Sequence, residues 1–248
     1  MFPIRDHNPS GRTPYVTLAL IVINVAVFLL YWLTLPNERA IGEFFYHWGL
    51  VPAFVTEGHD WHGILTSMFL HGGWMHLFGN MLFLYIFGDN LEDEMGHLPF
   101  LLFYLVSGLA AAALQIFADP WSNIPMVGAS GAIAGVMGAY LLLYPRAKVD
   151  VLFFFIVFFR VFPIPAWIML GVWLGLQVFG GVMANPDESG VAHWAHTGGF
   201  FAGLVLALPL WLRLGGPAFW SRTRGAPPHP GAEYAVTKSR IPVVRRLR

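Results

Sequence analysis

Long apolar segments separated by short polar ones dominate the chain. A membrane-spanning helix needs about 20 mostly apolar residues, with a range of about 17–25. The first such segment is too long for a cleavable signal peptide and lacks a small-residue cleavage site, so it reads as an anchor. The pattern predicts an all-α membrane protein, a bundle of six transmembrane helices at residues 15–35, 74–88, 98–117, 128–144, 166–183 and 194–212.

A shorter apolar run at 151–159 stands between Asp150 and Arg160. As a helix it would cover about 14 Å, about half of the roughly 30 Å hydrocarbon core. We interpret this run as an interfacial or re-entrant piece and not as a seventh span.

The remaining segments complete the predicted organisation. Residues 1–13 are a cytoplasmic N-terminal segment and 14–213 the membrane domain, whereas 214–248 form a basic, Pro- and Gly-rich tail that we expect to be disordered and cytoplasmic. A long amphipathic first outer loop, about 36–73, is predicted to lie in the membrane interface. Its aromatic residues are Phe44, Phe45, Tyr46, Trp48, Phe54 and Trp61.

Composition supports the membrane assignment. The chain is 56% hydrophobic and only 11% charged, whereas soluble domains carry about 25% charged residues. Because 14 acidic residues balance 14 basic ones, no net charge indicates a nucleic-acid partner; the lipid bilayer is the expected one. The absence of cysteine excludes disulfides, thiol nucleophiles and Cys-ligated metal centres, and no cofactor is expected.

The positive charges predict the orientation. With six spans and a cytoplasmic N-terminus, 13 of the 14 Lys and Arg residues fall on the inner side, and only Arg39 falls outside. Such a bias is typical of cytoplasmic segments. The prediction is a multi-pass protein of a bacterial inner membrane with both termini in the cytoplasm.

A few polar residues stand within the predicted spans, where each is a candidate functional residue. His76 and Asn80 share one face of the second span, Ser130 begins the fourth, and His193 and His196 begin the sixth. Because these three spans all enter the membrane from outside, their polar ends should converge.

The residue types predict nucleophilic catalysis. A serine hydroxyl becomes a good nucleophile when a neutral histidine removes its proton, which assigns Ser130 and His196 as a dyad. No Asp or Glu is expected in the pocket. His76, Asn80 and the Ser130 amide could stabilise an oxyanion. Small residues would let the two helices approach closely; they are Gly128, Gly131, Gly135, Gly199 and Gly203.

Simpler interpretations stay open. Ser130 could be only a helix cap, Asn80 an interhelical link, and the histidines packing residues. A metal site is disfavoured, because no HExxH pair occurs and no carboxylate stands at helical spacing from these histidines.

Five short motifs together resemble the rhomboid family of intramembrane serine proteases, over residues 14–212. They are WGLVPA at 48–53, LTSMF at 65–69, HGGWMHLFGN at 71–80, GASG at 128–131 and AHTGG at 195–199.

The resemblance implies cleavage of transmembrane protein substrates within or next to their membrane helix. It makes Ser130 the nucleophile, His196 the base, and His76 and Asn80 the oxyanion donors, and it implicates about 166–192 in substrate access. Two positions depart from the family pattern: His62 stands where many relatives have Arg, and Ala134 where some have an aromatic residue. An inactive, adaptor-like relative is the alternative, but such relatives typically lack the Ser or the His. The oligomeric state is not predicted.

Overall fold

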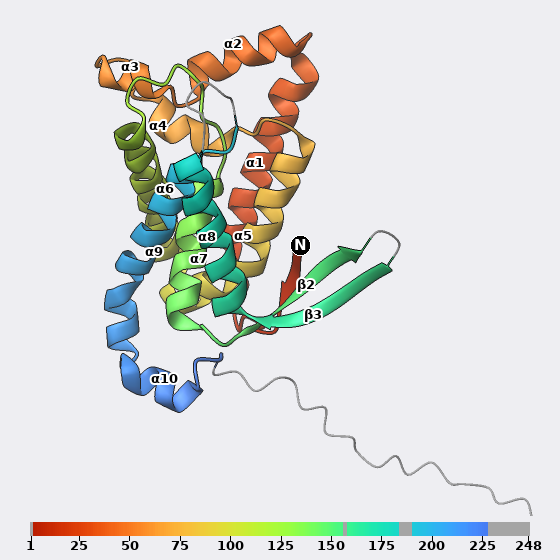
Figure 1. Ribbon diagram of the computed structural model, residues 1–248, viewed down its shortest axis with the longest axis vertical. Helices are drawn as coiled ribbons and strands as arrows, with labels where there is room; N and C mark the ends of the chain where they lie inside the picture. The colour runs from red at the N-terminus through yellow and green to blue at the C-terminus, as the bar shows by residue number, and fades with distance from the viewer. Residues whose placement is uncertain (1, 156–157, 184–189, 228–248) are drawn as a thin grey trace, which may run out of the picture.

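A computed structural model describes residues 2–155, 158–183 and 190–227. Six long helices stand roughly side by side (Figure 1) and match the six predicted segments to within a few residues at most ends. Four of them, α1, α6, α8 and α9, are long and apolar enough to cross a membrane. The six helices are α1 (Tyr15–Thr34), α5 (Trp74–Met95), α6 (His97–Ala118), α7 (Ser130–Leu143), α8 (Ala166–Met183) and α9 (His193–Arg213).

Helix α5 runs beyond the predicted end at residue 88, through an acidic turn to Met95. The reason is a contact with the start of α1. Both oxygens of the buried Glu92 carboxylate accept hydrogen bonds from the backbone N–H groups of Val16 and Thr17, each at 2.8 Å. These are donors that a helix start leaves without an intrahelical partner. Glu92 is therefore buried and caps the start of α1 instead of facing solvent.

Helix α7 is the centre of the bundle: every residue except Ser130 and Leu141 is buried. It packs on α9 backbone to backbone, as the glycine spacing predicted. A Cβ added to Gly199 would collide with the carbonyl oxygen of Gly131, and one added to Gly203 would collide with that of Gly135. This close approach fixes the relative height of the two helices.

Four short helical pieces cover one end of the bundle between α1 and α5 (Figure 1). The His62 ring bonds the carbonyl oxygen of His47 at 2.6 Å, and the Thr66 hydroxyl donates to that of Trp48 at 2.5 Å. His62 therefore ties the end of α2 to α4 at the position where many relatives carry Arg. The pieces are α2 (Glu38–Trp48), α3 (Pro52–Thr56), α4 (Gly63–Thr66) and η1 (Ser67–Phe69).

The expectation of an all-α protein was wrong, because a three-stranded antiparallel sheet lies at the other end of the bundle. Strands β2 (Lys148–Phe155) and β3 (Phe158–Pro165) form a hairpin that projects from the helices (Figure 1), and β1 (Phe2–Asp6) pairs with β2. The run at 151–159, interpreted above as an interfacial or re-entrant piece, therefore contributes to two strands. Its valine- and phenylalanine-rich sequence favours strands, and β1 supplies a distant partner strand, in which Arg5 pairs with Asp150, 145 residues later in the sequence.

The predicted disorder of the tail was also wrong for its first part. Helix α10 (Pro217–Thr223) folds back under the bundle, where the Trp220 indole N–H donates to the carbonyl oxygen of Leu142 at 2.9 Å. The rest of the predicted tail, 228–248, lies outside the described residues.

Candidate active site

Ser130 and His196 are in hydrogen-bond contact. Ser130 is the first residue of α7, and His196 lies in the first turn of α9. The distance between Ser130 Oγ and His196 Nε2 is 2.7 Å, within the range for a nucleophile and its base. The first glycine contact between the two helices joins Gly131, which directly follows Ser130, to Gly199, which lies one turn after His196, so the close helix packing sets this distance.

Gln177 of α8 lies behind the histidine, and sequence reasoning missed it. Its Oε1 is 2.8 Å from His196 Nδ1 and 2.9 Å from His193 Nδ1. Because an amide oxygen only accepts, both imidazoles must carry a proton on Nδ1. Neutral His196 then has a free lone pair on Nε2, so the Ser130 hydroxyl donates to it. A single glutamine in an apolar helix belongs to no recognisable motif. A strongly polar side chain inside a membrane span is, however, energetically costly, and this alone could have marked Gln177 as a candidate functional residue.

An aromatic ring from α8 also supports the histidine. The Trp173 and His196 ring centroids are 5.6 Å apart, with their planes tilted by 39°. Ala134, where some relatives have an aromatic residue, is fully buried. Here α8 supplies both the ring and the hydrogen-bond acceptor that position the imidazole.

His76 lies on the other side of Ser130. A Cβ added to Gly128 would lie 2.9 Å from His76 Nε2 and 3.4 Å from Ser130 Oγ, so both groups border this glycine, whose φ of +134° also disfavours other residues. The Gly72 N–H donates to His76 Nδ1 at 3.2 Å. Neutral His76 therefore carries its proton on Nε2, the atom that faces Gly128.

Asn80 follows one turn later on α5 and is 7% exposed. Its amide nitrogen donates to the His76 carbonyl oxygen of the same helix at 2.9 Å. That bond is intrahelical, so it gives no support to the interpretation of Asn80 as an interhelical link. The second N–H of the amide is left for another acceptor.

These side chains line one cavity of about 840 Å³. It lies between α5, α7, α8 and α9, towards the end that α2–α4 cover. Asp119, at the end of α6, also lines the cavity, so the expectation of a pocket without acidic residues was wrong. In the described part of the chain no carboxylate bonds His196, and no cluster of His, Asp or Glu could hold a metal ion. Two acidic residues that precede α9 in the sequence, Asp187 and Glu188, lie outside the described residues. The predicted residues brought to the cavity are His76, Asn80, Ser130, His193 and His196.

The Rhomboid domain family matches residues 58–213. The chain belongs to the rhomboid family. The matched region contains the five predicted site residues that line the cavity and the helices α5–α9. Family membership together with the apolar helices indicates an integral membrane protein.

Individual rhomboid relatives are moderately similar. The chain is 31% identical to RHOMBOID-like protein 5 of Arabidopsis thaliana over 73% of its own length and 52% of that protein. It is 33% identical to Rhomboid protease GluP of Bacillus subtilis, over 63% of this chain and 28% of GluP. Rhomboid protein 1, mitochondrial, of Saccharomyces cerevisiae is 34% identical over 60% of this chain and 41% of that protein. The chain thus spans about half or less of the length of these relatives. Because they include plant, bacterial and mitochondrial proteins, they do not indicate a single cellular compartment for this chain.

Proposed function

We propose that the protein is a serine-type intramembrane endopeptidase that cleaves transmembrane protein substrates within or next to their membrane helix. The observation that carries the proposal is the 2.7 Å contact of Ser130 Oγ with His196 Nε2, together with the acceptor on Nδ1 that fixes the tautomer. Membership in a family that includes Rhomboid protease GluP supports it.

The reaction follows from this arrangement. His196 Nε2 takes the Ser130 proton as Oγ attacks the substrate carbonyl carbon, which gives a tetrahedral oxyanion. The imidazolium then gives its proton to the leaving amine, and an acyl-enzyme forms on Ser130. Water then attacks the ester while His196 takes a proton from it. The imidazolium gives that proton to Ser130 Oγ as the ester bond breaks, which releases the carboxylic acid product and restores the free serine.

Three kinds of donor are available for the oxyanion. They are the Nε2–H of His76, the second N–H of Asn80 and the backbone N–H of Ser130 at the start of α7, where the helix dipole is positive. Donors that are already oriented stabilise the developing charge without reorganisation. Each is worth about 2.7–4 kcal/mol in typical acyl-transfer enzymes.

The proposed membrane arrangement has six spans within residues 14–213, with α5 and the 14-residue α7 added to the four helices that are long and apolar enough to cross a membrane. A 14-residue helix covers about 21 Å of a roughly 30 Å core. Ser130 would therefore lie below the membrane surface, in a water-accessible cavity. The basic residues favour a cytoplasmic location for both termini and for the sheet, with α2–α4 in the opposite interface.

Cleavage of a reconstituted transmembrane test substrate decides the proposal. Purified wild type in liposomes should produce two fragments, and folded Ser130→Ala should produce none. Ser122→Ala is the matched control: it removes a hydroxyl from the wall of the same cavity and should keep most of the wild-type rate. Wild-type cleavage by folded Ser130→Ala would disprove the serine mechanism. Wild type that binds the substrate without cleaving it would favour an adaptor.

A further inference from the structure

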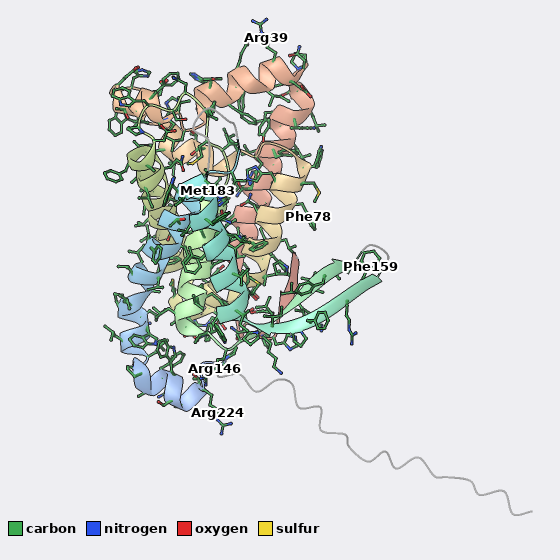
Figure 2. All side chains as sticks on the ribbon, in the orientation of Figure 1. Arg39, Phe78, Arg146, Phe159, Met183 and Arg224 are labelled. Carbon is green, nitrogen blue, oxygen red and sulfur yellow. The ribbon has the colours of Figure 1, made fainter. Side chains whose placement is uncertain are left out.

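A second cavity, of about 800 Å³, lies at the end of the bundle away from the active site. It is bordered by the end of α7, the start of α8, the middle of α9 and helix α10. Two arginines line it, Arg146 and Arg224, and Figure 2 shows them close together at this end, whereas Arg39 lies at the other. The apolar part of the wall includes Leu141, Trp167, Leu204 and Trp220.

Among the described residues Arg146 and Arg224 have no acidic partner, unlike Arg5 and Arg12 at the same end of the bundle. Arg5 Nε lies 2.7 Å from Asp150, and Arg12 Nε lies 3.6 Å from Asp93. Within residues 2–155, 158–183 and 190–227, neither Arg146 nor Arg224 forms an ion pair. Two uncompensated guanidinium groups on one cavity favour an anionic occupant.

Backbone contacts hold the two arginines together. The Arg146 N–H donates to the Gly225 carbonyl oxygen at 2.7 Å. Arg224 itself adopts a left-handed backbone conformation, with a φ of 57°, which is uncommon for a residue with a side chain and persists where the surroundings impose it. Together with the hydrogen bond from Trp220 to α7, these contacts hold the 217–225 segment against the end of α7. The cavity is thus formed partly by two segments about 80 residues apart in the sequence.

We propose that this cavity binds the phosphate-bearing headgroup of an anionic phospholipid. The planar guanidinium groups of Arg146 and Arg224 would bind the phosphate oxygens, since arginine matches that geometry with paired hydrogen bonds. Basic pockets between membrane helices on the Lys- and Arg-rich side of a membrane protein bind such headgroups. Tryptophans at the level of the headgroups are typical of the membrane interface.

The apolar wall favours a lipid over a free phosphate compound. A small phosphate would occupy only the arginine side and would leave Leu141, Leu204 and Trp167 against water. The first segment of an acyl chain would cover them. Because Trp167 belongs to α8, which also carries Gln177 and Trp173, the lipid would contact the base of the helix that positions the catalytic histidine.

Lipid binding to the delipidated full-length protein in neutral detergent tests the proposal. Phosphatidylglycerol and phosphatidylcholine with identical acyl chains are titrated, and bound lipid is counted by native mass spectrometry. Each arginine near an anionic headgroup usually contributes a similar, additive amount to lipid binding. Two arginines should therefore give wild type a preference for phosphatidylglycerol over phosphatidylcholine of roughly 30-fold. The double variant Arg146→Gln/Arg224→Gln should lose it. Arg213→Gln, which removes one positive charge from the same end without lining the cavity, should keep it.

Three results would overturn the proposal. A preference retained by the double variant, or lost equally in Arg213→Gln, would mean that general charge attraction is responsible. Binding of inorganic phosphate with the same arginine dependence, without any advantage of phosphatidylglycerol over phosphatidylcholine, would assign the cavity to a free phosphate compound.

A measurement on wild type alone covers the case in which the double variant fails to fold. A phosphatidylglycerol with a photoactivatable headgroup should cross-link to peptides that contain 141–146 or 217–225. Cross-links only elsewhere would contradict the site. None of these readouts uses cleavage, so the result is independent of the proposed protease activity.

Discussion

Replacing Gln177 by methionine should slow catalysis without weakening substrate binding. Methionine keeps the length of the side chain but removes the oxygen that accepts from Nδ1 of His196 at 2.8 Å. Without that acceptor the imidazole can turn or carry its proton on Nε2, the atom that must take the proton of Ser130. The effect should therefore fall on the chemical step.

The magnitude follows from the charge that develops on the ring. In the transition state His196 becomes an imidazolium, and its Nδ1–H bond becomes one to a charged group, worth about 1.5–3 kcal/mol. The variant also loses the neutral bond of about 0.5–1.5 kcal/mol in the ground state, so the barrier rises by the difference of about 1–1.5 kcal/mol, and kcat should fall roughly 5- to 15-fold. KM should change little, because this bond is already present before substrate binds and strengthens only as the ring becomes charged, so its loss lowers kcat and kcat/KM together.

The assay is cleavage of a transmembrane substrate in liposomes at several substrate densities, for three variants beside wild type. Gln177→Glu keeps an acceptor oxygen at the same reach and should recover most of the loss. Gln115→Met makes the same substitution in the cavity wall, but its oxygen accepts from the Ala195 backbone N–H at 3.1 Å and not from an imidazole; its kcat should fall much less. Equal falls for the two methionine variants, or a Gln177→Met variant with wild-type kcat, would refute the reasoning.

Three further predictions concern the oxyanion, the helix packing and the N-terminal strand. Asn80→Ala should cut turnover about 10²–10³-fold with little change in melting temperature, and unchanged turnover would remove Asn80 from the site. Gly203→Ala places a Cβ against the α7 backbone and should destabilise the fold by about 1–3 kcal/mol. Gly175→Ala, at a position with open space around it, should not. Equal melting temperatures for the two variants would contradict the close packing of α7 on α9. Burial raises the pKa of Asp6 to about 7, against a hydrogen bond from Tyr140 that lowers it. Stability should therefore fall as pH rises from about 4 to about 7, and Asp6→Asn should flatten that slope in thermal melts.

The helices and the approach of Ser130 to His196 were predictable from simple signals in the sequence. Length and apolarity locate a membrane helix, and span parity brings Ser130 and His196 to the same end. The glycine spacing on both helices then predicts how close they come. Each of these signals can be recognised in one segment of the chain at a time, without knowledge of its packing partner.

The sheet, α10 and Gln177 were not predicted, because each depends on partners distant in the sequence. Pairing of β1 with β2 joins residues 2–6 to 149–152. The composition of 151–159 favours strands, but it does not show which distant segment supplies the partner strand. Helix α10 depends on the bond from Trp220 to α7. Gln177 acquires its role only when α8 packs beside α9.

Labelling with a fluorophosphonate, followed by mass spectrometric localisation of the adduct, tests the central claim most directly. The probe reacts with a serine whose hydroxyl is activated by a base, and needs no knowledge of the natural substrate. The wild-type protein should carry the adduct on Ser130, and folded Ser130→Ala and His196→Ala should remain unlabelled. An unreactive wild type, an adduct on another serine, or equal labelling of His196→Ala would contradict the Ser130–His196 dyad.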